Sequence, residues 1–167
     1  MTTDTREIAA NAIVWARARL GDTDYATRCL AFVEDAIERS NGIEIFGGDC
    51  AAESARLYGS AENSGVPPLG ALVFYDGVGD IMGTRRNWGH VGLSLGNGLV
   101  IHAWDRVRID DHRAIAALSP AAGWEPLSAA GWTPLGRVLE NSTPKSYGAE
   151  DPADVAAQMQ TARFSQH

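Results

Sequence analysis

The sequence predicts a single α+β domain in which N-terminal helices pack on an antiparallel β-sheet. Two observations support this class. Apolar residues recur at helical spacing over roughly the first 60 residues, whereas beyond about residue 70 they fall in short or alternating runs bounded by Gly, Asn and Asp. A chain whose helices precede its strands is typical of α+β proteins, and 167 residues are enough to bury one core.

Three helices are expected in the N-terminal part. The first covers residues 3–20, where apolar side chains recur every three or four positions and a glycine follows. The second begins after an N-cap at Thr23 or Asp24 and runs to about Ser40, where an Asn-Gly pair ends it. A short third helix is expected from about 49 to 58.

Strands follow in the second part. Four segments have the apolar or alternating pattern of strands between turn-forming residues, namely "GALVFYDG", "GHVGLSLG", "GLVIHAWDRVRID" and "GWTPLGRVL". A short helical piece, "HRAIAAL", lies between the last two. We therefore expect residues 1–140 to form one domain, and the polar residues 141–167 to form a tail that is partly disordered or loosely docked.

The composition argues against several function classes. Lys and Arg number 14 against 21 Asp and Glu, a net charge of −7, which disfavours nucleic acid as a partner. The two cysteines form no CxxC pair and suggest neither a disulfide framework nor a structural zinc site, so we expect no metal and no cofactor. No obligate protein partner is indicated.

The sequence as written shows no export signal. Its N-terminal residues are charged and amphipathic, whereas a signal peptide needs an uncharged apolar run behind a basic start, and no stretch is long enough to span a membrane. We therefore expect a cytoplasmic protein with no membrane partner. An extracellular or cell-wall location is the expectation if export follows another route or if the sequence is a domain of a longer chain.

Cys29 has the sequence context of a reactive thiol. It lies near the start of the second expected helix, where the helix dipole favours a thiolate, and Arg28 adds a positive charge beside it. The alternative is that Cys29 is a small apolar residue on the buried face of the helix. A nucleophilic role requires a base within hydrogen-bonding distance and a third group that orients the base.

His90 and His102 are candidates for these two roles, since they lie on adjacent expected strands joined by "LGNGL". The loop length decides whether they meet, because side chains alternate between the two faces of a strand. With a two-residue loop at 97–98, His90 pairs with Asp105 and His102 points to the opposite face. With a three-residue loop at 96–98, His90 and His102 lie diagonally on one face.

Three segments stand out in this chain: the helix segment "CLAFVEDAIERSNGIEIF", the strand segment "PLGALVFYDG" and the hairpin segment "GHVGLSLGNGLVIHA". Together they resemble the NlpC branch of the papain-like cysteine peptidases. In that family a cysteine on a helix is followed by a strand of the type G-(D/A)-L-V-F-(F/Y), then by H-V-G-(I/L)-(Y/S)-L-G-N-G and a second H-A. The resemblance covers roughly residues 22–105. It implies a papain-like fold in which Cys29 is the nucleophile, His90 the general base and then acid, and His102 the residue that orients His90.

Cys50 is the competing cysteine, because "GGDCAAE" resembles the D-C-S-G motif around the nucleophile of the family. Cys29 is preferred because "CLAFV" matches the C-x-x-F-V helix of the family and the Asn-Gly break falls where the catalytic helix of the family ends. Arg28 replaces the usual aspartate, and Leu30-Ala31 replace the usual Ser-Gly. These departures concern the substrate subsites beside the nucleophile rather than the nucleophile itself.

Other candidate residues surround this set. Members of the family stabilise the oxyanion with the backbone N–H of the cysteine and with a tyrosine upstream of it, which in this chain is Tyr25. Trp88, Trp104 and Asp105 flank the two histidines and are candidates for lining the substrate cleft.

The resulting expectation is a thiol hydrolase that cleaves an amide bond through a thioester intermediate. The resemblance implies a peptide or muropeptide substrate from peptidoglycan. Two alternatives remain open. One is a CHAP-like amidase in which Asp105 or another polar residue takes the third position, and the other is a catalytically idle binding module of the same fold.

Overall fold

The computed structural model describes residues 3–148 and has the α+β architecture expected from the sequence. The helices are α1 (Thr3–Arg17), α2 (Cys29–Asn41), α3 (Ala51–Tyr58) and α4 (Leu135–Val138), with two 3₁₀ turns, η1 (Ser60–Glu62) and η2 (Ala114–Ala117). The strands are β1 (Ile43–Glu44), β2 (Leu72–Asp76), β3 (Val78–Ile81), β4 (Thr84–Asn87), β5 (His90–Gly96), β6 (Leu99–Ala103), β7 (Val107–Asp111), β8 (Ser128–Thr133) and β9 (Thr143–Pro144).

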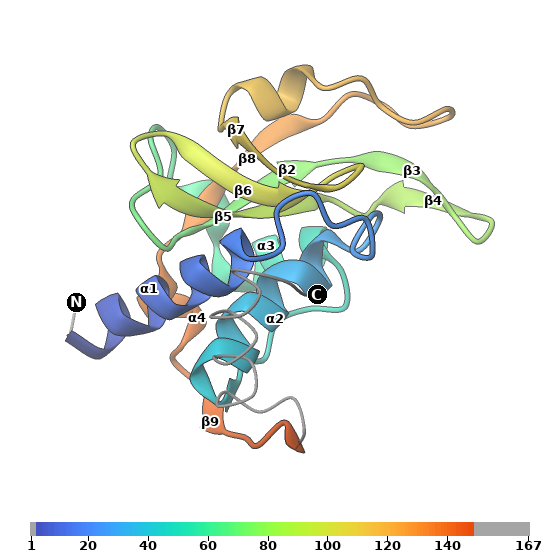
Figure 1. Cartoon of the computed structure of the whole chain (residues 1–167). Helices are drawn as coiled ribbons and strands as arrows, with labels where there is room; N and C mark the ends of the chain where they lie inside the picture. Colours follow the sequence, from blue (N-terminus) through green and yellow to red (C-terminus); the bar gives the residue numbers. More distant parts are fainter. Residues whose placement is uncertain (1–2, 149–167) are drawn as a thin grey trace.

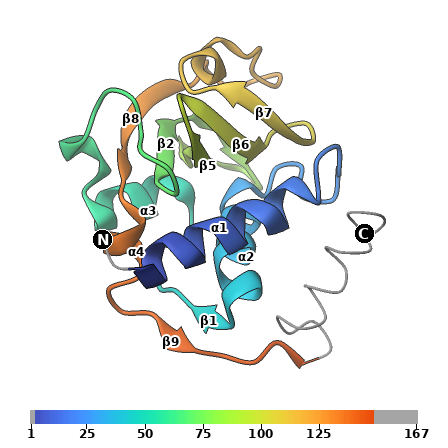
Figure 2. The same ribbon diagram turned by 60° about the vertical axis from the view of Figure 1, so that its left-hand side comes forward.

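The centre of the molecule is a five-stranded antiparallel sheet with the strand order β7-β6-β5-β2-β8. Helices α1 and α2 lie against one face of this sheet, and the segment that carries η2 lies against the other (Figures 1 and 2). The main core lies on the helix side and includes Trp15, Phe32, Ile37, Phe74, Leu93 and Ile101. A smaller core on the opposite face contains Val73, Tyr75, Val100, Ile115 and Leu127.

Helix α2 begins at Cys29 and not after the N-caps predicted at Thr23 and Asp24. Turns closed by short-range backbone hydrogen bonds fill the interval before it. Thr27 has a φ of 67°, in the left-handed region that a β-branched residue rarely adopts, and this conformation interrupts a continuous helix. The predicted end of the helix is confirmed, since Gly42 caps it with a φ of 62°.

Two of the predicted strands are divided differently in the structure. The segment "GLVIHAWDRVRID" forms both β6 and β7, because the chain turns where the backbone N–H of Trp104 donates to the carbonyl of Arg106. Asp105 is the turn-forming residue in this connection, but no glycine, proline or asparagine accompanies it, and the apolar pattern continues on both sides, so the sequence was interpreted as one strand. Only the start of "GWTPLGRVL" is a strand, because Pro134 cannot donate to a ladder and precedes α4. The β3–β4 hairpin lies outside the predicted strands.

The first residues of the predicted tail are attached to the domain. Strand β9 pairs with β1, the backbone N–H of Lys145 donates to the carbonyl of Gly42, and the hydroxyl of Tyr147 donates to the carbonyl of Ile43. Residues 149–167, which carry most of the tail prediction, lie outside the described residues.

Candidate active site

The β5–β6 hairpin brings the two predicted histidines to one face of the sheet. Its turn is the two-residue loop 97–98, whose φ angles of 54° and 82° match a type I′ turn. Leu95, however, is an extra residue in β5 and forms a β-bulge beside the turn. The bulge shifts the pairing by one position, so the hairpin combines the shorter loop with the register expected for the longer one. His90 and His102 therefore share a face.

The two imidazoles are in direct contact. Nε2 of His90 lies 2.8 Å from Nδ1 of His102, and the rings are nearly perpendicular, with an interplanar angle of 83°. His102 is fully buried and His90 is 4% exposed. Gly92 makes room for this contact, because a Cβ at that position would lie 3.0 Å from Cβ of His102 and closer still to Val100.

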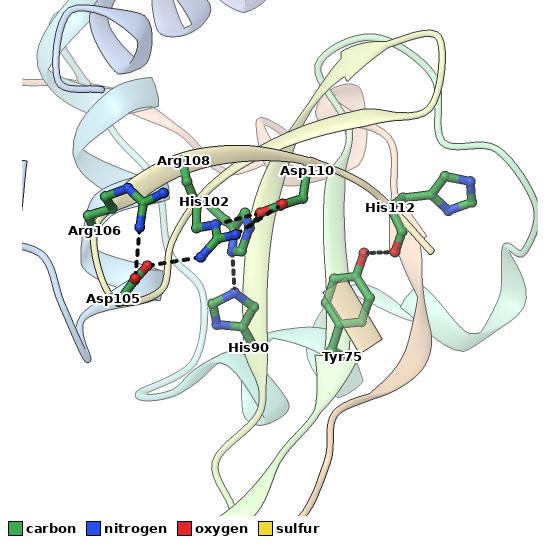
Figure 3. A network of polar contacts seen from close by, with 8 residues as sticks. All are labelled: Tyr75, His90, His102, Asp105, Arg106, Arg108, Asp110 and His112. Atoms are coloured by element: carbon green, nitrogen blue, oxygen red, sulfur yellow. Dashed lines mark hydrogen bonds and ion pairs between the residues drawn. The ribbon is translucent and has the colours of Figure 1, made fainter. Parts of the chain in front are cut away.

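A carboxylate and a guanidinium extend the histidine pair (Figure 3). Nε2 of His102 lies 2.8 Å from Oδ2 of Asp110, and Arg108 donates to both carboxylate oxygens, at 2.8 Å from Nε and 3.3 Å from Nη2. Asp110 is missing from the predicted site, because residues 98–110 were expected to form one strand. Once β7 is recognised, alternation identifies it: His102 pairs with Arg108, and Asp110 is the next residue on that face.

Cys29 is the first residue of α2 and is half-buried. Burial raises the pKa of its thiol to about 11, and the backbone N–H groups of Val91, Leu30 and Cys29 itself act in the opposite direction. Val91 directly follows His90, so the thiol lies beside the start of β5. Within residues 3–148 no hydrogen bond joins this thiol to His90.

Arg28 does not take the position expected for a cation that stabilises a thiolate. Its guanidinium lies over the ring of Tyr25, 5.3 Å from the ring centroid, and donates to the carbonyl of Asp24. The cause is the late helix start, since Arg28 is the N-cap of α2 with a non-helical backbone and an exposed side chain. The environment of the Cys29 thiol is therefore set by burial and backbone amides.

Both imidazoles are neutral at pH 7. Burial, and then the nearby His102, lower the pKa of His90 well below its ordinary value. Burial also lowers the pKa of His102, against the opposing hydrogen bond to Asp110. Partial burial alone would raise the pKa of Asp110, but the hydrogen bonds from His102 and Arg108 leave it below its ordinary value. At rest the site therefore combines a neutral thiol, two neutral imidazoles and an ionised carboxylate.

Of the flanking residues named from the sequence, Trp104 packs on the site and Trp88 lies beside it. The ring of Trp104 meets His90 edge to face, with centroids 5.2 Å apart. Trp88 precedes the start of β5, where its indole N–H donates to the carbonyl of Gly79 and the guanidinium of Arg86 lies over its ring. Both indoles are half-buried.

Tyr25 and Asp105 have other partners. The Tyr25 hydroxyl donates to Asp35 at 2.6 Å, and burial followed by this hydrogen bond raises the pKa of the phenol. Asp35 lies in the middle of α2, away from the helix start, so this hydroxyl is not directed at the thiol. Asp105 is exposed and its carboxylate binds Arg106 and Arg108. The structure thus leaves the oxyanion role without support from Tyr25 and separates Asp105 from His90.

Cys50 is half-buried at the N-cap of α3, with Nη2 of Arg86 3.5 Å from its sulfur. The start of α3 contacts the segment that leads into β5, because the backbone N–H of Ala52 donates to the carbonyl of Trp88. Cys50 is therefore close to the site region but is held to β4, whereas Cys29 lies against β5.

Residues 3–148 contain no group of three or more His, Cys, Asp or Glu side chains that could hold a metal ion. No helix in that range is long and apolar enough to cross a membrane.

A scan of the sequence against protein-family models gives no match, and a search of curated proteins gives none either.

Proposed function

We propose that the protein is a thiol hydrolase of papain-like fold that cleaves an amide bond through a thioester. The observation that carries this proposal is the hydrogen bond between His90 and His102. His90 is the first residue of β5, and the Cys29 thiol lies against the start of the same strand. A nucleophile at a helix N-terminus, a base on a neighbouring strand and a group that orients the base are the three parts that nucleophilic acyl transfer requires.

The resting charges favour a general-base mechanism. Because the pKa of the thiol is raised and that of His90 is lowered, neither group is charged at neutral pH. Nε2 of His90 is occupied by His102, which leaves Nδ1 as the ring nitrogen open to another partner. As substrate approaches, the thiol proton passes to Nδ1 while the sulfur attacks the carbonyl carbon.

The remaining steps return the site to its starting state. The tetrahedral oxyanion forms beside the backbone N–H of Cys29 at the start of α2, where the positive end of the helix dipole stabilises negative charge. Collapse breaks the C–N bond, and the proton on His90 leaves with the amine. Water then attacks the thioester, giving its proton to His90, and the acid is released as the thiol is restored.

The substrate class is supported by the resemblance to NlpC-type peptidases. We propose peptidoglycan stem peptides or soluble muropeptides, whose amide bonds such enzymes cleave, as the substrates. His102 is favoured over Asp105 as the third residue, because His102 contacts His90 and the Asp105 carboxylate is paired with two arginines. This assignment favours an NlpC-like arrangement over a CHAP-like amidase that uses Asp105.

The test is incubation of the full chain with purified sacculi and, separately, with soluble muropeptides, followed by mass spectrometry of the fragments. We expect new fragments that differ from the substrate by cleavage of one amide bond. Cys29→Ala should abolish them and Cys50→Ala should retain them. Binding of sacculi by the wild-type chain without any cleavage would overturn the proposal and favour the idle binding module.

A further inference from the structure

We infer that Asp110 is a positioning residue that fixes which nitrogen of each histidine carries a proton, and that Arg108 holds Asp110 in place for this purpose. The inference deepens the proposed function, since it rests on His90 acting as the base. It concerns a residue outside the Cys29, His90 and His102 set, and it is carried by the chain of hydrogen bonds from β7 to β5 (Figure 3).

The contact with Asp110 determines which nitrogen of His102 carries a hydrogen. An ionised carboxylate can only accept hydrogen bonds, and the hydrogen bonds that Asp110 receives hold its pKa below its ordinary value. The nitrogen of His102 that lies 2.8 Å from Oδ2 is Nε2, so Nε2 must carry the hydrogen. His102 is neutral, and its other nitrogen, Nδ1, is therefore bare and can only accept.

The tautomer of His102 in turn fixes the tautomer of His90. Nδ1 of His102 accepts, so Nε2 of His90, 2.8 Å away, must donate. His90 is neutral as well, which leaves its Nδ1 with a lone pair and no hydrogen. This lone pair is what a base needs to take the thiol proton. The opposite tautomers would place a hydrogen on Nδ1 of His90 and remove the base.

Arg108 limits how the carboxylate of Asp110 can rotate. Its Nε and Nη2 donate to the two carboxylate oxygens, and its Nη1 lies 3.2 Å from Oδ1 of Asp105. A guanidinium can only donate, so it reinforces the acceptor character of the carboxylate. Asp105 therefore acts at the outer end of the network, on the arginine, and not on His90.

The tautomers can be measured directly by ¹⁵N NMR of the imidazoles in the full chain at neutral pH. We expect both His90 and His102 to be protonated at Nε2 and bare at Nδ1. In Asp110→Ala, His102 loses its acceptor, while the donor-only Arg108 remains its cross-strand neighbour, so His102 should gain the Nδ1–H form and His90 should follow. Asp111→Ala is the matched control, because the neighbouring carboxylate binds Arg113 and not the histidines.

The result that overturns the inference is a wild-type His102 protonated at Nδ1, or tautomers that do not change in Asp110→Ala. The wild-type spectrum decides even if a variant fails to fold. With a cleaved substrate in hand, Asp110→Ala should lower kcat about 100-fold with little change in KM, whereas Asp111→Ala should match the wild type. Because the NMR measurement needs no turnover, expected tautomers without any hydrolysis would count against the proposed function and not against the role of Asp110.

Discussion

The strand-borne and helix-borne parts of the candidate site are organised by different forces. On the strands, His90, His102 and Asp110 are joined by hydrogen bonds of 2.8 Å, and each imidazole has a defined partner. On the helix, Cys29 has no side-chain partner of this kind within the described residues, and its surroundings are apolar core and backbone amides. His90, the proposed base, is thus positioned by hydrogen bonds, while the thiol is positioned by the start of α2.

This difference indicates where activation of the thiol must come from. Its pKa is raised to about 11, so the free protein does not hold a preformed thiolate. In the proposed mechanism, a bound substrate displaces water and brings its carbonyl carbon close to the sulfur. The thiol then loses its proton in the same step in which the sulfur attacks that carbon.

Replacement of Cys29 should have the largest effect. Loss of a nucleophile removes the covalent route, and we expect Cys29→Ala to lower the rate of muropeptide cleavage by about 10⁴-fold or more. Cys50→Ala, which changes the other half-buried thiol, should keep most of the rate. Rates followed by chromatography decide between the two cysteines. Equal loss in both variants would contradict the assignment of Cys29.

Loss of the second histidine should come next. His102→Ala leaves His90 without the group that orients it, and we expect turnover to fall about 100- to 1,000-fold. Asp105→Ala should cost no more than about threefold, since that carboxylate binds arginines and does not contact His90. Comparison of kcat for the two variants separates the alternatives. A larger loss in Asp105→Ala would restore Asp105 as the third residue.

How much of the site could be predicted also differs between its parts. The shared face of His90 and His102 depends on parity, and two loop lengths were possible from the sequence. The structure uses the shorter loop with a bulge at Leu95, a combination that restores the register of the longer loop. Gly96, beside Leu95 in this bulge, has a φ of 85° that glycine tolerates, but a glycine before an Asn-Gly pair fits either loop length. The sequence therefore predicted the two alternatives but not which one occurs.

Two features of the site were not predicted correctly from residue type: the start of α2 and the role of Asp110. Caps at Thr23 and Asp24 were reasonable by residue type, yet the left-handed conformation of Thr27 delays the helix until Cys29. Asp110 was missed because the turn before β7 has a single turn-forming residue, Asp105, inside an otherwise strand-like pattern. Helices α1, α2 and α3 and the central strands β2 and β5 were predicted from apolar periodicity, whereas the residues that complete the site depend on turns and tertiary pairing.

Gly92 connects the histidine pair to the packing of the sheet. Gly92→Ala places a Cβ within 3.0 Å of Cβ of His102, and we expect it to reduce the free energy of unfolding by about 1–3 kcal/mol and to lower turnover. Gly136→Ala is the control, because nothing lies within 4 Å of a Cβ at that helical position. Urea unfolding gives both values. Equal stability of the two variants would show that the sheet relaxes around the added methyl group.

The buried imidazoles should also affect the pH dependence of stability. Their pKa values are lower in the folded chain than the ordinary 6.5, so below about pH 6.5 the unfolded chain binds more protons and stability falls, by up to about 1.4 kcal/mol per pH unit for each histidine. Glu34 acts with the opposite sign: burial raises its pKa to about 7, above the ordinary 4.5, so acidification through that window favours the folded chain.

Urea unfolding at several values between about pH 5 and pH 7.5 measures both contributions. Glu34→Gln removes the stabilisation gained on acidification, so its stability should fall more steeply with decreasing pH than that of the wild type. His90→Gln removes one neutral imidazole, so its stability should fall less steeply. A steeper fall for His90→Gln than for the wild type would mean that His90 gains rather than loses affinity for protons on folding, and that it is not the neutral base of the proposed mechanism.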